Sequence, residues 1–563
     1  MRDLSLSGFK AGAAEAGPRA RRAVPAAIAV AAALLASAAV KAADVLTQHN
    51  DRLRSGVNGE ETVLTPANVN AATFGKLFAY AVDGAVYAQP LVMTGVAIPN
   101  RGTHNVVFVA TEHDSVYAFD ADDGAGANSA SFWHRSFLDD APPGVVFSPV
   151  LPSDVSSADI SPEMGITSTP VIDPATGTLY VCANTKENDG HVTSFNYRLH
   201  ALDVATGAEK FGGPVVISAV VNGVGDGTDQ GQVWFSGLRN LQRPGLLLLN
   251  GVVYLGFGTH ADVPPSHGWL MGYDAATLQQ VAVINLSPNA SFDSIWMDGC
   301  GPAADAAGGI YFATGNGPFD LASGGADAGD SVLRVVPNGA GFTIADYFTP
   351  YDQDLLDSLD VDLGSGGVML MPDQPSAPTH LAVQCGKEGR IYVMDRDNLG
   401  HYDPSKDNVV QTWKVLPGCF STPVFFNDTL FYGGSDYTQG PLEAFTFSGG
   451  QFNPQAASKA AVIFPYPGVT PSVSANGSQG GIVWVTEHNH PAVLHAYLPT
   501  DLTHELYNSN QASGGADNPG DGVKFSVPTI CNGKVYVGTQ TELDVYGLRP
   551  AVRRPRRVAH GLF

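Results

Sequence analysis

The stretch Val106–Asp123, VVFVATEHDSVYAFDADD, decides the fold of this chain. Its opening residues are β-branched, aromatic or small, which is typical of a short strand. The polar run Thr111–Asp114 predicts a tight turn, and Val116–Phe119 predicts the returning strand. An Asp-rich segment then ends the unit. We therefore interpret the stretch as a β-hairpin that leads into a loop.

Variants of this hairpin recur along the whole chain. Eight copies can be aligned, with their first strands at 107–109, 179–182, 253–256, 310–313, 381–385, 430–433, 482–485 and 535–538. Most copies follow a short strand led by proline, as in Gln89-Pro90-Leu91, and proline is tolerated at the first position of a strand. Serial repetition of small antiparallel sheets predicts a propeller, because one such sheet cannot bury both of its faces alone.

The predicted fold is all-β, an eight-bladed β-propeller of four-stranded antiparallel sheets. The last copy stops near Gly547 without an outer strand, whereas an extra strand-like segment, 74–82, precedes the first copy. We expect this N-terminal strand to complete the last blade and to close the ring. Closure would remove the open sheet edges that otherwise promote aggregation.

Three segments are expected along the chain: a signal peptide at 1–42, the propeller at 43–548 and a basic, disordered tail at 549–563. Arg19, Arg21 and Arg22 precede an apolar, Ala-rich run at 24–40, which has the length of a signal-peptide core. An uncleaved membrane anchor is the alternative, and the arginine pair raises a twin-arginine export route. We expect an exported protein, periplasmic or extracellular, with no transmembrane segment after signal removal.

The charge of the chain limits its partners. It has 30 Lys+Arg against 54 Asp+Glu, a formal net charge of −24. Such a surface repels nucleic acid and anionic membranes and attracts cations. We expect no nucleic-acid partner and a monomer whose partner is a small molecule, a carbohydrate or a protein.

The chain contains five cysteines, so at least one thiol stays free in an oxidising compartment. None of them has the spacing of a metal motif or of covalent haem attachment. Pairing of Cys385 with Cys419, in neighbouring repeats, is one arrangement that the order of the repeats allows.

Polar side chains gather in the turns between the second and third strand of each blade. In a propeller these B–C turns emerge on the same face as the crossings from one blade to the next, and function is commonly placed on such loops. We therefore expect a polar mouth on this face that binds the ligand or partner. The candidate residues are Glu112, His113, Asp114, His260, Asp262, His267, Trp296, Asp298, Lys387, Glu487 and His488.

Two of these turns match closely, Val109-Ala-Thr-Glu-His113 and Val485-Thr-Glu-His488. Adjacent Glu and His can bind a divalent metal or act as base and acid. The other interpretation, which we favour, is that they bond turn backbones and reflect common repeat ancestry. Trp296 beside Asp298 suits a flat or carbohydrate-like ligand, or packs between blades instead.

The repeats resemble the pyrroloquinoline-quinone (PQQ) repeat family of eight-bladed, quinoprotein-like propellers. The matching signature is Ala201-Leu-Asp-Val-Ala-Thr-Gly207, with echoes at Tyr273–Thr277 and Ala118–Asp122. The resemblance spans about residues 65–548 and concerns the fold, since a fold does not determine an activity.

The resemblance implies two functions. One is a scaffold that binds a ligand or a protein, similar to BamB-like propellers. The other is a PQQ- and calcium-dependent quinoprotein alcohol dehydrogenase, in which a mouth carboxylate acts as base and Lys387 stabilises the reduced quinone. The adjacent cysteine pair of alcohol-oxidising members is missing, so no cofactor is assured and no catalytic or metal residue is assigned. We favour the scaffold; a lyase or hydrolase acting on a polymer is a third hypothesis.

Overall fold

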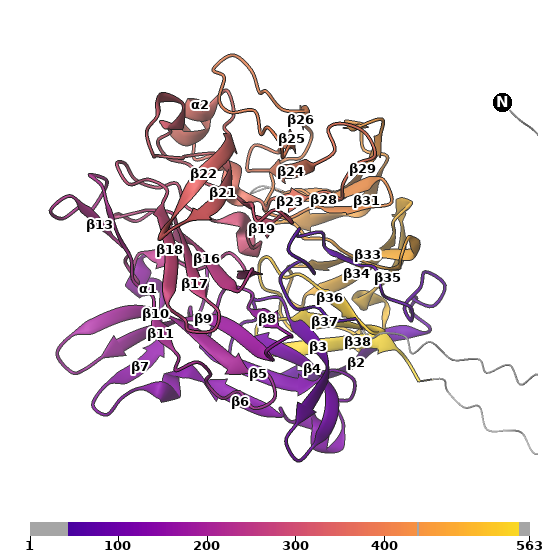
Figure 1. Cartoon of the computed structure of the whole chain (residues 1–563). Coiled ribbons are helices and arrows are strands. Elements are labelled where there is room, and N and C mark those ends of the chain that lie inside the picture. The colour runs from indigo at the N-terminus through magenta and orange to yellow at the C-terminus, as the bar shows by residue number, and fades with distance from the viewer. Residues whose placement is uncertain (1–42, 436–438, 551–563) are drawn as a thin grey trace, which may run out of the picture. The chain divides into compact units, whose positions relative to one another are not determined.

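The computed structural model describes residues 43–435 and 439–550. The expected signal peptide and residues 551–563 of the expected tail lie outside these ranges. Within them the chain forms eight small antiparallel sheets arranged as the blades of a propeller, as the repeats predicted (Figure 1). In each blade we call the innermost strand A and the outermost strand D.

Each blade is built from strands that follow one another in the sequence, except in blade 7, which gains a strand from near the N-terminus, and in blade 8, where the ring closes. Blades 1 to 4 contain β3 (Leu91–Ile98), β4 (Gly102–Ala110), β5 (Ser115–Asp120) and β6 (Trp133–Ser136); β7 (Val146–Pro149), β8 (Val171–Asp173), β9 (Thr178–Asn188), β10 (Thr193–Asp203) and β11 (Val215–Val216); β14 (Asn240–Leu241), β15 (Leu247–Leu249), β16 (Val252–Thr259), β17 (Trp269–Asp274) and β18 (Gln280–Asn285); and β19 (Ala303–Ala304), β20 (Ile310–Ala313), β21 (Val332–Asn338) and β22 (Gly341–Phe348).

The second half of the ring repeats this order. Blades 5 to 8 contain β23 (Met369–Leu370), β24 (Leu381–Cys385), β25 (Arg390–Asp395) and β26 (Gln411–Lys414); β27 (Val424–Phe426), β28 (Thr429–Gly433), β29 (Gln439–Ser448), β30 (Gln451–Phe452) and β31 (Ser458–Pro465); β1 (Val57–Asn58), β32 (Ser472–Asn476), β33 (Gln479–Glu487), β34 (Val493–Leu498) and β35 (Asp501–Asn508); and β36 (Thr529–Cys531), β37 (Lys534–Gly538), β38 (Glu542–Leu548) and β2 (Phe74–Ala81).

Strand β2 closes the ring as predicted. It pairs antiparallel with β38, from Phe74 opposite Leu548 to Ala81 opposite Glu542. Lys76 on β2 forms ion pairs with Asp544 and Glu542 on β38. Strands from the two ends of the propeller sequence therefore share one blade. In this blade β2 covers the outer edge of β38, which would otherwise be unpaired.

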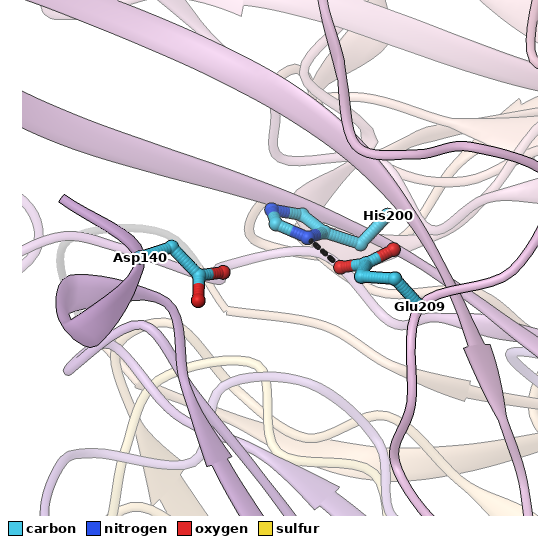
Figure 2. A group of neighbouring side chains, drawn as sticks. All are labelled: Asp140, His200 and Glu209. Carbon is cyan, nitrogen blue, oxygen red and sulfur yellow. Dashed lines mark hydrogen bonds and ion pairs between the residues drawn. The ribbon is translucent and has the colours of Figure 1, made fainter. Parts of the chain in front are cut away.

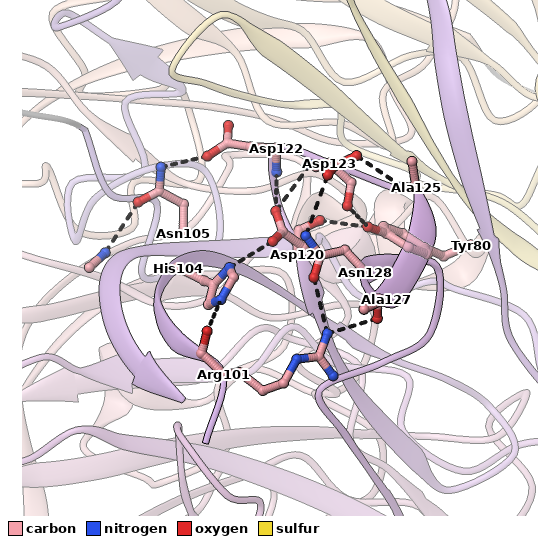
Figure 3. A network of polar contacts seen from close by, with 11 residues as sticks. Tyr80, Arg101, His104, Asn105, Asp120, Asp122, Asp123, Ala125, Ala127 and Asn128 are labelled. Carbon is pink, nitrogen blue, oxygen red and sulfur yellow. Dashed lines mark hydrogen bonds and ion pairs between the residues drawn. The ribbon is translucent and has the colours of Figure 1, made fainter. Parts of the chain in front are cut away.

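The aspartate that ends strand C holds the turn after it. Asp120 Oδ1 accepts the backbone N–H groups of Asp122 and Asp123 at 2.9 and 3.0 Å, and His104 Nδ1 donates to Oδ2 at 2.8 Å (Figure 3). The Tyr80 hydroxyl, on β2 of blade 8, donates to the carbonyl oxygens of Asp120 and Asp123. The turn of blade 1 is thereby tied to the neighbouring blade.

The same device explains the repeat signature. Asp203 Oδ1 accepts the backbone N–H of Ala205 at 3.1 Å and the Thr206 hydroxyl at 2.9 Å, and Asp274 does the same in blade 3 with Ala276 and Thr277. Aspartate and threonine favour such local turns. The signature is therefore a structural element of the blade rather than a binding motif.

The core lies between neighbouring blades. One cluster of buried residues joins Tyr80 of blade 8, Phe108 of blade 1 and Leu179 of blade 2, and another joins Leu247, Phe312 and Tyr392 of blades 3, 4 and 5. Burial of each large apolar side chain stabilises the fold by roughly 1.5–3 kcal/mol. Blade-to-blade packing therefore carries the stability of the ring.

An irregular segment, 43–61, runs along the inner strands of the ring. Its backbone or side chains bond blade 1 at Val92, blade 2 at Ile172, blade 4 at Ala304 and blade 5 at Leu370. It then adds β1 in parallel to β32 of blade 7, and Asn58 Nδ2 donates to the Ile530 carbonyl of blade 8. The repeats do not predict this segment, because residues 43–61 have no repeat character.

Arg54 anchors the middle of this segment. Its side chain is fully buried and donates to the Thr47 hydroxyl and to the carbonyl oxygens of Gln48, Leu246 and Pro302. The Leu246 bond reaches blade 3, and Gly56 lies so close to Val424 of blade 6 that a Cβ would meet it at 2.6 Å. Residues 43–61 thus contact all eight blades.

The remaining elements are short. A side hairpin pairs β12 (Val220–Asn222) with β13 (Gln232–Trp234), and the α-helices are α1 (Pro152–Val155) and α2 (Gln353–Ser358). In the described part of the chain, no helix is long and apolar enough to cross a bilayer. All five cysteines are buried free thiols, including Cys385 and Cys419. Arg549, assigned to the tail above, contacts Asp517 at 2.5 Å.

Candidate functional site

A polar cavity of about 270 Å³ opens on the face where the B–C turns and the crossings between blades emerge. We call it the mouth cavity. It is lined by Asp159, Arg243, Ala261, Asp262, Trp296, Asp298, Asp360, Asp362, Ser365, Lys387, Phe420 and Tyr466.

Most of these side chains come from the crossings that lead from strand D of one blade to strand A of the next. Six consecutive crossings contribute to the cavity, beginning with Asp159 between blades 1 and 2 and ending with Tyr466 between blades 6 and 7. The B–C turns add only Ala261 and Asp262 of blade 3 and Lys387 of blade 5. Each crossing returns to the innermost strand, so its last residues lie nearest the axis of the ring.

Arg243 and Asp298 form a buried ion pair in this cavity. Arg243 Nη2 lies 3.3 Å from Asp298 Oδ1, and both side chains are more than nine-tenths buried. Asp298 Oδ2 is buried without a hydrogen-bond partner among the described residues. Burial raises the pKa of Asp298 to about 7, against the opposing effect of Arg243. A carboxyl that titrates near neutrality in a cavity marks a functional candidate.

Lys387 is held by two carboxylates. Its Nζ lies 2.5 Å from Asp362 Oδ2 and 3.1 Å from Asp360 Oδ1. Burial of the ammonium lowers the pKa of Lys387, but the attraction of Asp362 and Asp360 outweighs burial and raises it overall. Lys387 therefore stays charged throughout the physiological range.

A third cation, Lys524, lies next to the cavity lining. Its Nζ lies 3.7 Å from Asp159 Oδ1. The neighbouring residue, Phe525, packs under Arg243, whose guanidinium lies 4.3 Å from the centroid of the ring. Burial and the neighbouring Arg243 lower the pKa of Lys524. Phe525 and Lys524 belong to the crossing between blades 7 and 8, which thereby also reaches the cavity region.

Asp262 and Trp296 complete the polar and aromatic character of the cavity. Asp262 Oδ1 accepts the Thr259 hydroxyl at 3.1 Å, and burial raises the pKa of Asp262 to about 6. Trp296 is 8% exposed and stands two residues before Asp298. Five carboxylates face two cations around the cavity, so the lining favours a neutral or cationic ligand over an anion.

The structure brings four of the predicted residues together in the mouth cavity: Asp262, Trp296, Asp298 and Lys387. Glu112 and Asp114 are fully buried and do not line the cavity. Glu112 Oε2 accepts the Gly165 N–H at 2.8 Å and the Thr167 hydroxyl at 3.1 Å, and burial raises the pKa of Glu112 to about 8. Burial, followed by the nearby Glu112, also raises the pKa of Asp114 well above its usual value.

The three predicted histidines of blades 1 and 3 have separate surroundings. His113 Nδ1 donates to Glu163 Oε1 at 2.8 Å. His267 bonds the Ser287 hydroxyl and the Asp226 carbonyl, and it therefore stabilises loops. His260 is buried, and burial lowers its pKa to about 4, so it is neutral at physiological pH.

The Glu–His turn of blade 7 does not mirror that of blade 1. Glu487 accepts from Asn489 Nδ2 at 2.6 Å and from His495 Nε2 at 3.2 Å. His488 lies 5.7 Å, ring to ring, from His490, and burial lowers the pKa of His488. The Glu-His pairs that the two turns share therefore lie in different environments.

Four charged residues of the lining were not among the predicted residues: Asp159, Arg243, Asp360 and Asp362. Their position in crossings was the feature of the sequence that could have indicated them, because crossings emerge on the same face as the B–C turns. Since several charged residues lie in each crossing, the sequence could not indicate which of them would reach the axis.

Comparison with known proteins agrees with this fold. No protein-family model matches the chain, and no curated protein is significantly similar to it in sequence. Among solved structures, the quinohemoprotein alcohol dehydrogenase from Comamonas testosteroni superposes with a TM-score of 0.58 at 15% identity, over 91% of this chain and 81% of that one. BamB from Moraxella catarrhalis gives a TM-score of 0.47 at 12% identity, over 84% and 99%.

The similarity to the dehydrogenase indicates a class of fold. The chain is an eight-bladed propeller with the architecture of PQQ-like propellers, which confirms the predicted resemblance. At such low identity the likeness concerns the fold alone, and activity has to be argued from the mouth cavity.

Proposed function

We propose that this protein binds a small, hydroxyl-rich molecule of sugar size in the mouth cavity, as an exported binding module. The observation that supports this most is Asp298, a carboxyl that lines the cavity and whose buried Oδ2 has no hydrogen-bond donor among the described residues. An unsatisfied buried acceptor costs about 1–3 kcal/mol, which a ligand hydroxyl would offset.

The other lining residues complement such a ligand. Asp262 and Asp298 accept hydrogen bonds, Arg243 and Lys387 donate them, and Trp296 offers an aromatic surface. The volume of about 270 Å³ lies just below the roughly 300–1,000 Å³ of typical ligand pockets. It therefore suits a molecule of monosaccharide size rather than a protein segment. The acidic lining favours neutral or amino sugars over uronic acids.

The second candidate is a PQQ- and calcium-dependent dehydrogenase, which two cations and Trp296 in one cavity would support. Calcium takes six to eight oxygen ligands within about 2.6 Å. Among the residues described, no three carboxylate or imidazole groups converge around the mouth cavity, and the group that does converge lies elsewhere. Asp298, Asp360 and Asp362 are instead committed to Arg243 and Lys387. As placed, the lining does not fit calcium, so we derive no reaction through this cofactor.

Isothermal titration of the purified, processed protein separates the two. Neutral hexoses, hexosamines and hexuronic acids should be compared, followed by PQQ with calcium and with chelator. We expect binding of a neutral or amino sugar that is lost in Trp296→Ala and retained in Glu163→Gln, which lies outside the cavity. Tight, calcium-dependent binding of PQQ would establish the dehydrogenase instead, and a protein that binds none of the sugars would refute our proposal.

A further inference from the structure

A group of potential metal ligands lies in the outer part of blade 2, away from the mouth cavity. One ligand atom from each of Asp140, His200 and Glu209 lies within 4.8 Å of the other two (Figure 2). Asp140 ends the 3-10 helix η2 (Phe137–Asp140), His200 is on β10, and Glu209 follows the signature turn of blade 2. They border a cavity of about 520 Å³.

The imidazole of His200 is held firmly in place. Its side chain is 2% exposed, and the ring stacks on Phe137 with centroids 3.6 Å apart. Nδ1 lies 2.6 Å from Glu209 Oε1. A carboxylate accepts only, so Nδ1 donates this hydrogen bond and Nε2 is the nitrogen left for a metal ion.

A matched pair in blade 7 shows what is special about His200. His495 occupies the corresponding position of strand C, and its Nδ1 lies 2.6 Å from Glu505 Oε1. There Glu487 occupies the second nitrogen, Nε2, at 3.2 Å. In blade 7, Val485 of strand B pairs with His495, and Glu487 follows two positions later. In blade 2, Val181 pairs with His200, and the residue two positions later is Ala183.

Ala183 leaves room beside the ring. It lines the same cavity as His200, Asp140 and Glu209. His200 Nε2 has no hydrogen-bond partner among the residues that the structure describes, 43–435 and 439–550. Blade 2 therefore keeps the histidine and its carboxylate partner, removes the side chain that would block the ring, and adds Asp140 from the adjoining segment.

We propose that Asp140 and Nε2 of His200 bind a divalent transition-metal ion, with the cavity supplying space for coordinated water. Glu209 holds the imidazole in place through Nδ1, as carboxylates commonly do for metal-binding histidines. A nitrogen and a carboxylate oxygen suit Zn²⁺ or Co²⁺ better than Ca²⁺, which prefers oxygen alone.

Arg135 competes for this group. Its Nη2 donates to both oxygens of Asp140, at 2.6 and 2.8 Å. Bound metal and the guanidinium both attract the Asp140 carboxylate, so Arg135 weakens binding. Substitution of Arg135 is therefore informative. It should strengthen metal binding at Asp140 and should not change the affinity of a metal ion that binds at another place on the protein.

The test is titration of untagged, chelator-treated full-length processed protein with Zn²⁺, and with Co²⁺ monitored by visible absorption. We expect one ion per chain, at least tenfold weaker binding in Asp140→Asn and His200→Asn, and several-fold tighter binding in Arg135→Gln. His495→Asn is the matched control and should bind like the parent.

Circular dichroism and thermal unfolding without metal show whether each variant folds. Should His200→Asn fail to fold, Asp140→Asn decides, because the Asp140 side chain is 27% exposed and at the edge of the blade. Equal loss in His200→Asn and His495→Asn, unchanged binding in Asp140→Asn, or no affinity tighter than millimolar in the parent would overturn the proposal.

Discussion

The indole ring of Trp133 in blade 1 lies directly against Gly207 in blade 2, so close that a Cβ at Gly207 would meet Trp133 Cε3 at 2.6 Å. Gly207 has φ +71°, and Trp133 Nε1 donates to the Val204 carbonyl at 3.0 Å. The glycine of the repeat signature thus serves both the turn and the contact between two blades.

Gly207→Ala should destabilise the protein through both effects. The left-handed backbone costs roughly 1 kcal/mol for a side chain, and displacement of the indole adds more, for a total of about 2–4 kcal/mol. Urea unfolding measures the loss. Gly177→Ala is the control, since Gly177 has φ +60° but only an ordinary contact with Val204 at 3.5 Å. Equal losses in both variants would contradict the role of Trp133.

Lys76→Met tests the closure of the ring. Asp544 is fully buried, and without Lys76 it loses its cationic partner and keeps the hydrogen bond from the Gly520 N–H. Burial raises the pKa of Asp544 to about 7, although Lys76 opposes this, so the carboxyl is charged at pH 8 and neutral at pH 5.5. We expect a loss of about 3 kcal/mol at pH 8 and a smaller loss at pH 5.5, measured by urea unfolding.

Lys534→Met provides the comparison for Lys76→Met. Lys534 lies 3.7 Å from Asp122, whose side chain is 45% exposed, so its loss should cost at most about 1 kcal/mol at either pH. A pH-independent effect of Lys76→Met would show that the ion pair does not hold the closing strands together.

Glu112→Gln should change how stability depends on pH. The pKa of Glu112 is about 8 in the folded protein and about 4.5 when unfolded. Between these values the folded protein keeps a proton that the unfolded chain has released, so the free energy of unfolding falls as pH rises. The variant should remove on the order of 2 kcal/mol of this fall. Chemical denaturation from pH 4.5 to 8.5 measures it, and an unchanged pH dependence in the variant would contradict this role of Glu112.

Ligand binding in the mouth cavity should also depend on pH. Asp298 accepts a ligand hydroxyl best when ionised, and its pKa is about 7. Arg243, Lys524 and Lys387 favour the ionised form, whereas burial and Asp362 oppose it. We expect affinity for the sugar to rise about tenfold from pH 6 to 8, and Asp298→Asn to bind weakly with a flat profile. Titration calorimetry at three pH values would reveal the opposite trend if the protonated carboxyl were the binding form.

The blades could be predicted because their strands repeat a local pattern. The hairpin of Val107–Phe119 follows from β-branched and aromatic runs on either side of a polar turn, and the closing strand at Phe74 follows from a missing outer strand. The segment around Arg54 could not be predicted in this way. Its partners are carbonyl groups of residues such as Pro302, 248 positions away, and its sequence has no strand periodicity.

The mouth cavity was predictable only in part, for a related reason. Asp262 and Lys387 lie in B–C turns, whose position follows from the repeat. Arg243 and Asp362 lie in crossings without repeat similarity, where the path of the backbone determines which side chain reaches the axis. Glu112 and Glu487 show the converse, since one sequence motif leads to burial in one blade and to a histidine partner in the other.

The segment 43–61 changes how the ring is expected to unfold and assemble. In a protein made only of repeats, each unit contacts its neighbours and the units can open one after another. Here residues 43–61 contact every blade, so no blade can separate from the ring without breaking its contacts with this segment. The ring should therefore unfold in a single cooperative step. It also precedes all blades in the chain, yet its contact with Ile530 exists only once blade 8 has formed. The first part of the propeller to be synthesised is thus the last to reach its place.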